Sequence, residues 1–145
     1  PRLLESVLDV NREQPSRMVD AAERAVGDLK GKTVAVLGLA FKPGTDDMRD
    51  APSLKIIAAL LDKGASVRAY DPLAMDAARR SIDRQIEYCE GVKAAVDDAD
   101  CVLIVTEWDE FRDESLYNGR VVIDGRRALD PRRAVEICDY HGICW

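Results

Sequence analysis

The sequence predicts an α/β fold, a three-layer α/β/α sandwich with a mainly parallel sheet of five or six strands, preceded by a long N-terminal helix. Short apolar segments alternate with segments of helical periodicity from about residue 31 onward. The central segments are apolar almost throughout, which is typical of parallel strands covered on both faces. The chain has 145 residues, enough for one domain with a proper hydrophobic core.

The first expected element is a helix from Arg2 to about Leu29, or two helices in series. Its apolar residues recur at helical spacing: Leu3, Leu4, Val7, Leu8, Met18, Val19, Ala22, Val26 and Leu29. Proline cannot donate the backbone hydrogen bond of a helix, so we expect a kink or a break between Asn11 and Pro15. Because the chain opens in register on this helix without a cap, we expect it to be a piece of a longer protein.

After Gly31 the pattern changes to alternating strands and helices. The strands are expected at about 33–39, 66–70, 85–89, 101–105, 121–123 and 140–143, of which 85–89 has the weakest pattern. The helices are expected at about 52–62, from Asp71-Pro72 onward, and at about 91–97, 110–117 and 131–138.

Composition limits the classes of function. A third of the residues are charged, both signs are mixed, and the net charge is −6. This charge disfavours a general nucleic-acid-binding protein, although a local basic pocket for a small anion is compatible with it. No apolar run approaches the roughly 18 residues of a membrane span, and no signal-peptide pattern is present. We therefore expect a cytoplasmic protein without membrane contact.

The cysteines do not form a recognisable metal or catalytic pattern. Cys89, Cys101, Cys138 and Cys144 include no Cys-x-x-Cys pair, and His141 is the single histidine. Cys101 lies in an apolar strand, where a thiol behaves as a small hydrophobic group. A zinc site and a catalytic thiol are the alternatives, but no acid–histidine partner is available to activate a thiol. We expect structural cysteines and no metal.

The two common phosphate-binding loops are missing. A dinucleotide-binding Gly-x-Gly-x-x-Gly should follow the first strand, but no Gly-x-Gly occurs anywhere in the chain. Five residues separate Gly38 from Gly44, and Thr45 follows without the lysine that a Walker loop requires. Any phosphate must therefore be bound in another way.

Cations follow the ends of the expected strands instead. Lys42 and Arg49 lie in the segment between the first strand and its helix, and Arg126 follows the strand at 121–123. The carboxyl ends of parallel strands meet at one edge, so these cations can converge on an anion that spans more than one phosphate. The alternative is that each is a surface charge paired with one of the nearby acids Asp46, Asp47, Asp50 or Asp124. Phe41 either stacks on a ligand or simply packs against the rest of the protein.

Asp46 and Asp47 are candidates for magnesium ligands or for the acidic pocket of a phosphoacceptor receiver domain. A receiver domain also needs an aspartate at the end of the third strand and a lysine after the fifth. Here the third strand ends in the residues 88–90, Tyr-Cys-Glu, and arginines follow the fifth. We instead expect Thr45 and the two aspartates to shape the loop and to orient its cations through hydrogen bonds.

Two further groups lie at strand ends. Asp71 occupies the position where a Rossmann domain has its ribose-binding acid, but Asp71-Pro72 also fits a helix N-cap with proline at N1, which we favour. The segment of Thr106, Glu107 and Trp108 follows an apolar strand. Trp108 can stack at a pocket or seal the core.

Four motifs in order resemble a known family: GLAFKPGTDDMRDAPS at 38–53, VRAYDP at 67–72, VTEWDEF at 105–111 and VIDGRR at 122–127. They are similar to the C-terminal part of the UDP-glucose and GDP-mannose dehydrogenase family over nearly the whole chain. The residues 106–108, Thr-Glu-Trp, look more like the UDP-glucose branch than the acetylmannosamine or GDP-mannose branches.

The resemblance implies a division of the chain and a function. Residues 1–30 would be the end of the central interdomain and dimerisation helix, and residues 31–145 a Rossmann-like UDP-sugar-binding domain. The whole enzyme would oxidise UDP-glucose to UDP-glucuronate with NAD and a catalytic cysteine. Alternatives are the same domain of a UDP-N-acetylmannosamine or GDP-mannose dehydrogenase, or a non-catalytic nucleotide-binding or dimerisation module.

The resemblance also assigns residues. Phe41, Lys42 and Arg126 would bind the UDP-sugar, and Arg49 would approach NAD held mainly by the family's N-terminal domain. The family's NAD fingerprint and catalytic-cysteine motif do not occur in this sequence, so no catalytic residue is carried over and this chain alone is expected to be inactive. The implied partners are the UDP-sugar, the N-terminal dehydrogenase domain and, in the full-length protein, a second copy.

Overall fold

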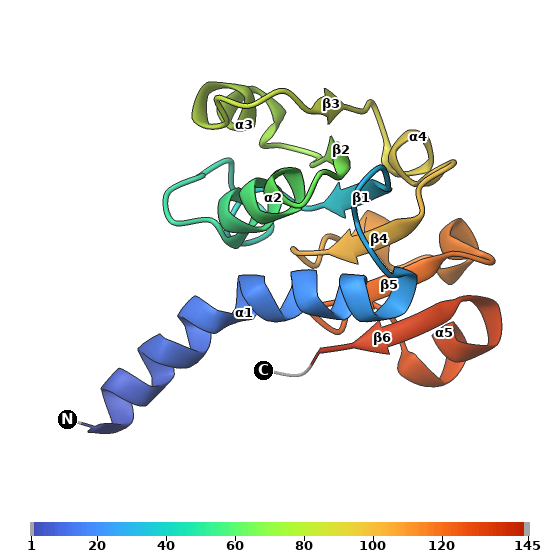
Figure 1. The fold of residues 1–145 in the computed structure, drawn as a ribbon, viewed down its shortest axis with the longest axis horizontal. Coiled ribbons are helices and arrows are strands. Elements are labelled where there is room, and N and C mark those ends of the chain that lie inside the picture. Colours follow the sequence, from blue (N-terminus) through green and yellow to red (C-terminus); the bar gives the residue numbers. More distant parts are fainter. Residues whose placement is uncertain (1, 144–145) are drawn as a thin grey trace.

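The protein contains one parallel sheet of six strands, in the order β3-β2-β1-β4-β5-β6 (Figure 1). The computed structural model describes residues 2–143, with side chains in the first helix described from residue 14 onward. The strands are β1 Thr33–Leu37, β2 Ser66–Tyr70, β3 Glu87–Tyr88, β4 Cys101–Ile104, β5 Val121–Asp124 and β6 Asp139–Gly142. This order is that of the doubly wound Rossmann arrangement, which confirms the predicted α/β class and its parallel sheet.

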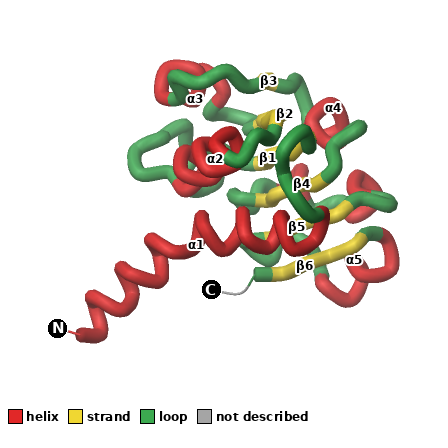
Figure 2. Tube along the Cα trace, in the orientation of Figure 1, coloured by secondary structure: helices red, strands yellow, loops and turns green. Residues whose placement is uncertain are grey.

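Helices cover both faces of the sheet (Figure 2). They are α1 Arg2–Val26, α2 Pro52–Asp62, α3 Met75–Ser81, α4 Val92–Val96 and α5 Pro131–Ile137. Pro15 lies inside α1, which changes direction along its length in Figure 1. The side chains of Leu3, Leu4, Val7 and Leu8, and Cys144, lie outside the part that is described. No helix in the described part has the length and apolar character needed to cross a bilayer.

Alternate residues of each central strand enter two separate cores. Val34 and Val36 of β1 pack with Met18 of α1 and Ile56 of α2 on one face. Leu37 packs on the other face, in a core that α4 and α5 complete. The side chains of a strand alternate between faces, so continuous apolar strands are what such a two-sided core requires. The second half of α1 is therefore packed directly on the sheet.

The structure differs from expectation in two helices. The segment expected as one helix over 110–117 forms two 3₁₀ turns, η1 Asp109–Phe111 and η2 Glu114–Tyr117. The Asp113 carboxylate accepts the Ser115 amide and so caps the start of η2. This cap separates η2 from η1. The helix after β2 begins at Met75 rather than at Pro72, because a turn intervenes.

Candidate functional site

The candidate site lies at the topological switch point of the sheet, between the carboxyl ends of β1 and β4. The connection from β1 leads to one side of the sheet and the connection from β4 leads to the other, which leaves a crevice where ligands bind in such folds. The loops 38–51 and 105–108 meet at this point. The Thr106 hydroxyl donates a hydrogen bond to the Ala40 carbonyl at 2.8 Å, and both residues are buried.

Gly38 allows these two loops to approach closely. Its φ is +94°, and a Cβ placed on it would lie 2.4 Å from the Cβ of Thr106. Glycine is the residue that tolerates both this backbone conformation and this contact. The close approach fixes the start of loop 38–51 against β4.

Asp71, at the end of β2, holds the same loop from the other side. It is 1% exposed. Its Oδ2 accepts the backbone N–H groups of Leu39 and Ala40 at 2.8 and 3.3 Å, and its Oδ1 accepts those of Leu73 and Ala74, each at 2.8 Å. The expected helix N-cap at Asp71 is therefore wrong, because the N-cap of α3 is Ala74 and Asp71 holds the turn before that helix. The bonds from Asp71 to loop 38–51 are a second role that the sequence did not indicate.

The region does not fit the usual dinucleotide site of this fold. That site needs an acid at the end of β2 that is free for a ribose hydroxyl. Both oxygens of Asp71 are already used by four backbone donors. The glycine-rich turn of that site is replaced by residues 38–51. The described residues therefore provide no standard cradle for NAD.

Local hydrogen bonds shape the middle of loop 38–51, as expected. The Thr45 hydroxyl accepts the Asp47 amide at 3.1 Å, and Asp47 Oδ1 accepts the Arg49 amide at 2.9 Å. The Arg49 guanidinium also donates to the Asp47 carboxylate, at 2.8 Å from Nη2 to Oδ2. This pairing holds the pKa of Asp47 at about 2. The paired-charge alternative is therefore correct for Arg49, although its side chain remains 88% exposed.

Phe41 and Lys42 are the first exposed residues of loop 38–51, after its buried start. The Lys42 Nζ lies 5.3 Å from the centroid of the Phe41 ring, within range of a cation–π contact. Phe41 is 38% exposed, which is unusual for a large apolar side chain in this protein. An exposed ring beside an ammonium group offers a stacking surface and a charge to a ligand.

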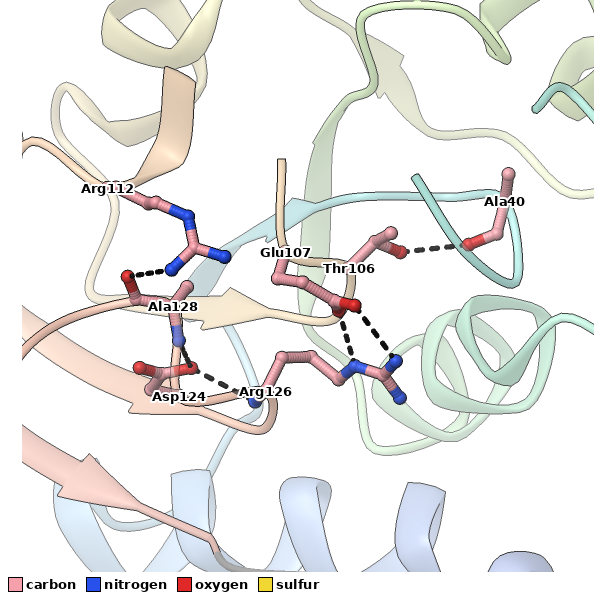
Figure 3. A network of polar contacts seen from close by, with 7 residues as sticks. All are labelled: Ala40, Thr106, Glu107, Arg112, Asp124, Arg126 and Ala128. Carbon is pink, nitrogen blue, oxygen red and sulfur yellow. Dashed lines mark hydrogen bonds and ion pairs between the residues drawn. The ribbon is translucent and has the colours of Figure 1, made fainter. Parts of the chain in front are cut away.

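A second buried aspartate, Asp124 at the end of β5, holds the loop that carries Arg126. Its Oδ1 accepts the amides of Arg126 and Ala128 at 3.0 and 3.1 Å (Figure 3). Its Oδ2 accepts the Leu129 amide at 3.0 Å and the Tyr140 hydroxyl at 2.8 Å. Asp124 therefore binds the backbone of Arg126 rather than its guanidinium, contrary to the suggested charge pairing.

The guanidinium of Arg126 pairs with Glu107 of the neighbouring loop (Figure 3). Its Nε donates to Oε2 at 2.6 Å and its Nη2 to Oε1 at 3.2 Å, a bidentate pair between half-buried side chains. Partial burial opposes ionisation of Glu107, but the hydrogen bonds and charge of Arg126 contribute to a net lowering of its pKa. Glu107 is thus ionised near neutral pH. Glu107 as the partner of Arg126 is a contact that the sequence did not indicate.

The cations therefore follow the ends of β1 and β5, at one edge of the sheet, as predicted. A hollow of about 330 Å³ lies beside Arg49 and α3. A larger hollow of about 760 Å³ lies at the opposite edge, where its single arginine, Arg68, is already bound to Glu87 and to a backbone carbonyl. We place the site at the carboxyl edge because its cations carry the charge that an anion needs.

The described cysteines lie in the interior. Cys89, Cys101 and Cys138 are buried and free. Burial raises the pKa of Cys101 to about 12 and raises the pKa values of the other two above their ordinary value. A thiol must ionise to act as a nucleophile, so these three are poor candidates for covalent chemistry.

The fold is that of a Rossmann-like domain in which loop 38–51 occupies the place of the glycine-rich turn. Residues 35–131 match the model of the UDP-glucose/GDP-mannose dehydrogenase family, UDP binding domain. The chain belongs to this family, and the match covers loop 38–51 and the loop of Arg126.

Known relatives agree with this assignment. The chain is 46% identical over 140 residues to the UDP-glucose 6-dehydrogenase AglM of Haloferax volcanii, covering 94% of this chain and 32% of that protein. It is 43% identical over 150 residues to the UDP-glucose 6-dehydrogenase TuaD of Bacillus subtilis, covering 98% and 32%. The structure is similar to that of a UDP-glucose dehydrogenase from Pyrobaculum islandicum, with a TM-score of 0.87, 39% identity, and coverage of 97% and 32%. The chain spans about a third of the length of these relatives.

Proposed function

We propose that this chain binds the UDP part of a sugar nucleotide within an NAD-dependent UDP-glucose 6-dehydrogenase that works as a dimer. The observation that carries the proposal is the match of residues 35–131 to the UDP binding domain of the family. That range contains Phe41, Lys42, Arg49 and Arg126, all at the carboxyl edge of the sheet. The three relatives described above are UDP-glucose dehydrogenases, which favours UDP-glucose over other sugar nucleotides.

In this proposal each residue has a distinct role. Lys42 supplies a point charge and Arg126 a planar set of donors to the pyrophosphate and nearby sugar oxygens. Phe41 offers its exposed ring for stacking. Arg49, which is exposed beyond its pair with Asp47, approaches an NAD molecule held by another part of the enzyme.

We expect the double substitution Lys42→Ala, Arg126→Ala to raise the Kd for UDP by about 100-fold. A charge-assisted hydrogen bond contributes about 1.5–3 kcal/mol, and a loss of about 3 kcal/mol corresponds to about two orders of magnitude in affinity. Isothermal titration of this chain with UDP measures the effect.

The matched control for that experiment is the double substitution Lys30→Ala, Arg84→Ala. Lys30 precedes β1 and Arg84 precedes β3, so this variant loses the same charge at the opposite edge of the sheet. Its Kd for UDP should stay within about twofold of the wild type, because exposed charges further than a Debye length are largely screened. Equal affinity in both double variants would reject the assignment of Lys42 and Arg126 to the site.

We expect this chain alone to form no NADH from UDP-glucose and NAD. The dinucleotide cradle is absent from the described residues, and the buried thiols of Cys89, Cys101 and Cys138 have raised pKa values. The appearance of NADH, followed by its absorbance, measures turnover. Steady formation of NADH by the purified chain would contradict the proposal that NAD binding and the catalytic thiol belong to another part of the enzyme.

A further inference from the structure

The pair of Glu107 and Arg126 uses one edge of the guanidinium and leaves the other free. An arginine side chain has five N–H donors in a planar fork. Glu107 accepts from Nε and Nη2, which together form the side edge of that fork. The remaining nitrogen, Nη1, points away from Glu107 in Figure 3. Among the described residues, no hydrogen bond is found for Nη1, so the outer edge, formed by Nη1 and Nη2, keeps donors for a second bidentate contact.

The loops that carry both partners are held by hydrogen bonds next to them. Asp124 accepts the backbone amide of Arg126 at 3.0 Å. Glu107 directly follows Thr106, whose hydroxyl is bonded to the carbonyl of Ala40 in loop 38–51. The loops that carry Arg126 and Glu107 are thus each held by a hydrogen bond, and the bond beside Glu107 also reaches the loop of Lys42.

We propose that Glu107 is a positioning residue that holds Arg126 by its side edge and presents the outer edge to a phosphate of the ligand. The proposal rests on the proposed function, since UDP is the ligand considered. An arginine that is already held in one geometry loses less side-chain freedom when it binds an anion. Glu107 acts through Arg126 and need not touch the ligand.

The direction in which the UDP affinity changes after Glu107→Ala distinguishes a positioning role from simple charge repulsion. A carboxylate beside an anion site repels the anion, so electrostatics alone predicts tighter UDP binding after Glu107→Ala. Positioning predicts weaker binding, by roughly three- to tenfold, because the freed arginine must be ordered by the ligand. Glu107→Gln retains one acceptor oxygen for Nε and should fall between the wild type and Glu107→Ala.

A double-mutant cycle, measured by titration with UDP, tests whether the effect passes through Arg126. Glu107→Ala should weaken binding in the wild type. In the Arg126→Ala background it should cause no loss of affinity, because only the relief of repulsion remains there. The control Glu90→Ala removes an exposed acid that follows β3, and it should leave the affinity unchanged. Unchanged or tighter binding in Glu107→Ala, or an equal loss in the Arg126→Ala background, would overturn the proposal.

A measurement without ligand separates this proposal from the proposed function. In ¹H–¹⁵N spectra the Nε–H of Arg126 should exchange slowly with water in the wild type and rapidly in Glu107→Ala. Rapid exchange in the wild type would overturn the positioning role, whatever UDP does. Slow exchange in a wild type that fails to bind UDP would reject the proposed function and, with it, the phosphate as the group that Arg126 is positioned to meet.

Discussion

Gly38→Ala should lower the free energy of unfolding by about 2–5 kcal/mol. A left-handed backbone costs an L-residue about 1–2 kcal/mol, and forcing extra atoms into a packed site costs about 1–3 kcal/mol. Both costs apply here, because φ is +94° and the new Cβ would lie 2.4 Å from Thr106 Cβ and 2.6 Å from the Thr106 amide nitrogen. The second contact is with backbone, so a change of side-chain rotamer cannot relieve it. Urea unfolding followed by circular dichroism measures the loss.

Gly44→Ala is the matched control for this prediction. Gly44 lies in the same loop and has a φ of +80°, but an added Cβ would meet no atom within 4 Å. This variant should therefore show the conformational cost alone, about 1–2 kcal/mol. The difference between the two variants isolates the contact with Thr106. If both variants lose the same stability, the close approach of the two loops is not what requires glycine at residue 38.

Elements with local signals could be predicted from the sequence. The helix α2 was expected at about 52–62 and is found at Pro52–Asp62, because Pro52 is favourable at the first helical position and Gly64 follows the end. The prediction of one helix over 110–117 is wrong. The apolar spacing there is compatible with a helix, but the Asp113 carboxylate accepts the Ser115 amide and caps a separate turn. The side chain of Asp113 competes locally for a backbone amide and so interrupts a continuous helix.

The same distinction applies to the candidate site. The contact between Asp47 and Arg49 spans two residues, so the sequence alone predicts that acids of this loop orient its cations. The contact between Glu107 and Arg126 spans 19 residues and joins loops that follow neighbouring strands. Predicting it requires the strand order and the register, which composition and periodicity do not supply.

Asp71→Asn should lower the free energy of unfolding by about 2–4 kcal/mol and loosen the start of loop 38–51. Asparagine has nearly the same shape, but its NH₂ group replaces one acceptor oxygen and then faces either Leu39 and Ala40 or Leu73 and Ala74. A buried donor left without an acceptor costs about 1–3 kcal/mol, and the bonds that remain lose the contribution of the charge. For a chain of this size the loss corresponds to a fall in Tm of about 4–16 °C. Thermal unfolding measures it.

Hydrogen exchange then shows whether Asp71 supports the site as well as the fold. The amides of Leu39 and Ala40 directly precede Phe41 and Lys42, so losing their acceptor should speed their exchange and weaken UDP binding together. The control Asp83→Asn changes an exposed aspartate and should alter neither quantity. Unchanged exchange at Leu39 and Ala40 in a destabilised Asp71→Asn variant would show that Asp71 supports only the turn before α3. Faster exchange together with weaker UDP binding would show that one buried carboxylate couples the β2 end of the sheet to the loop that carries Lys42.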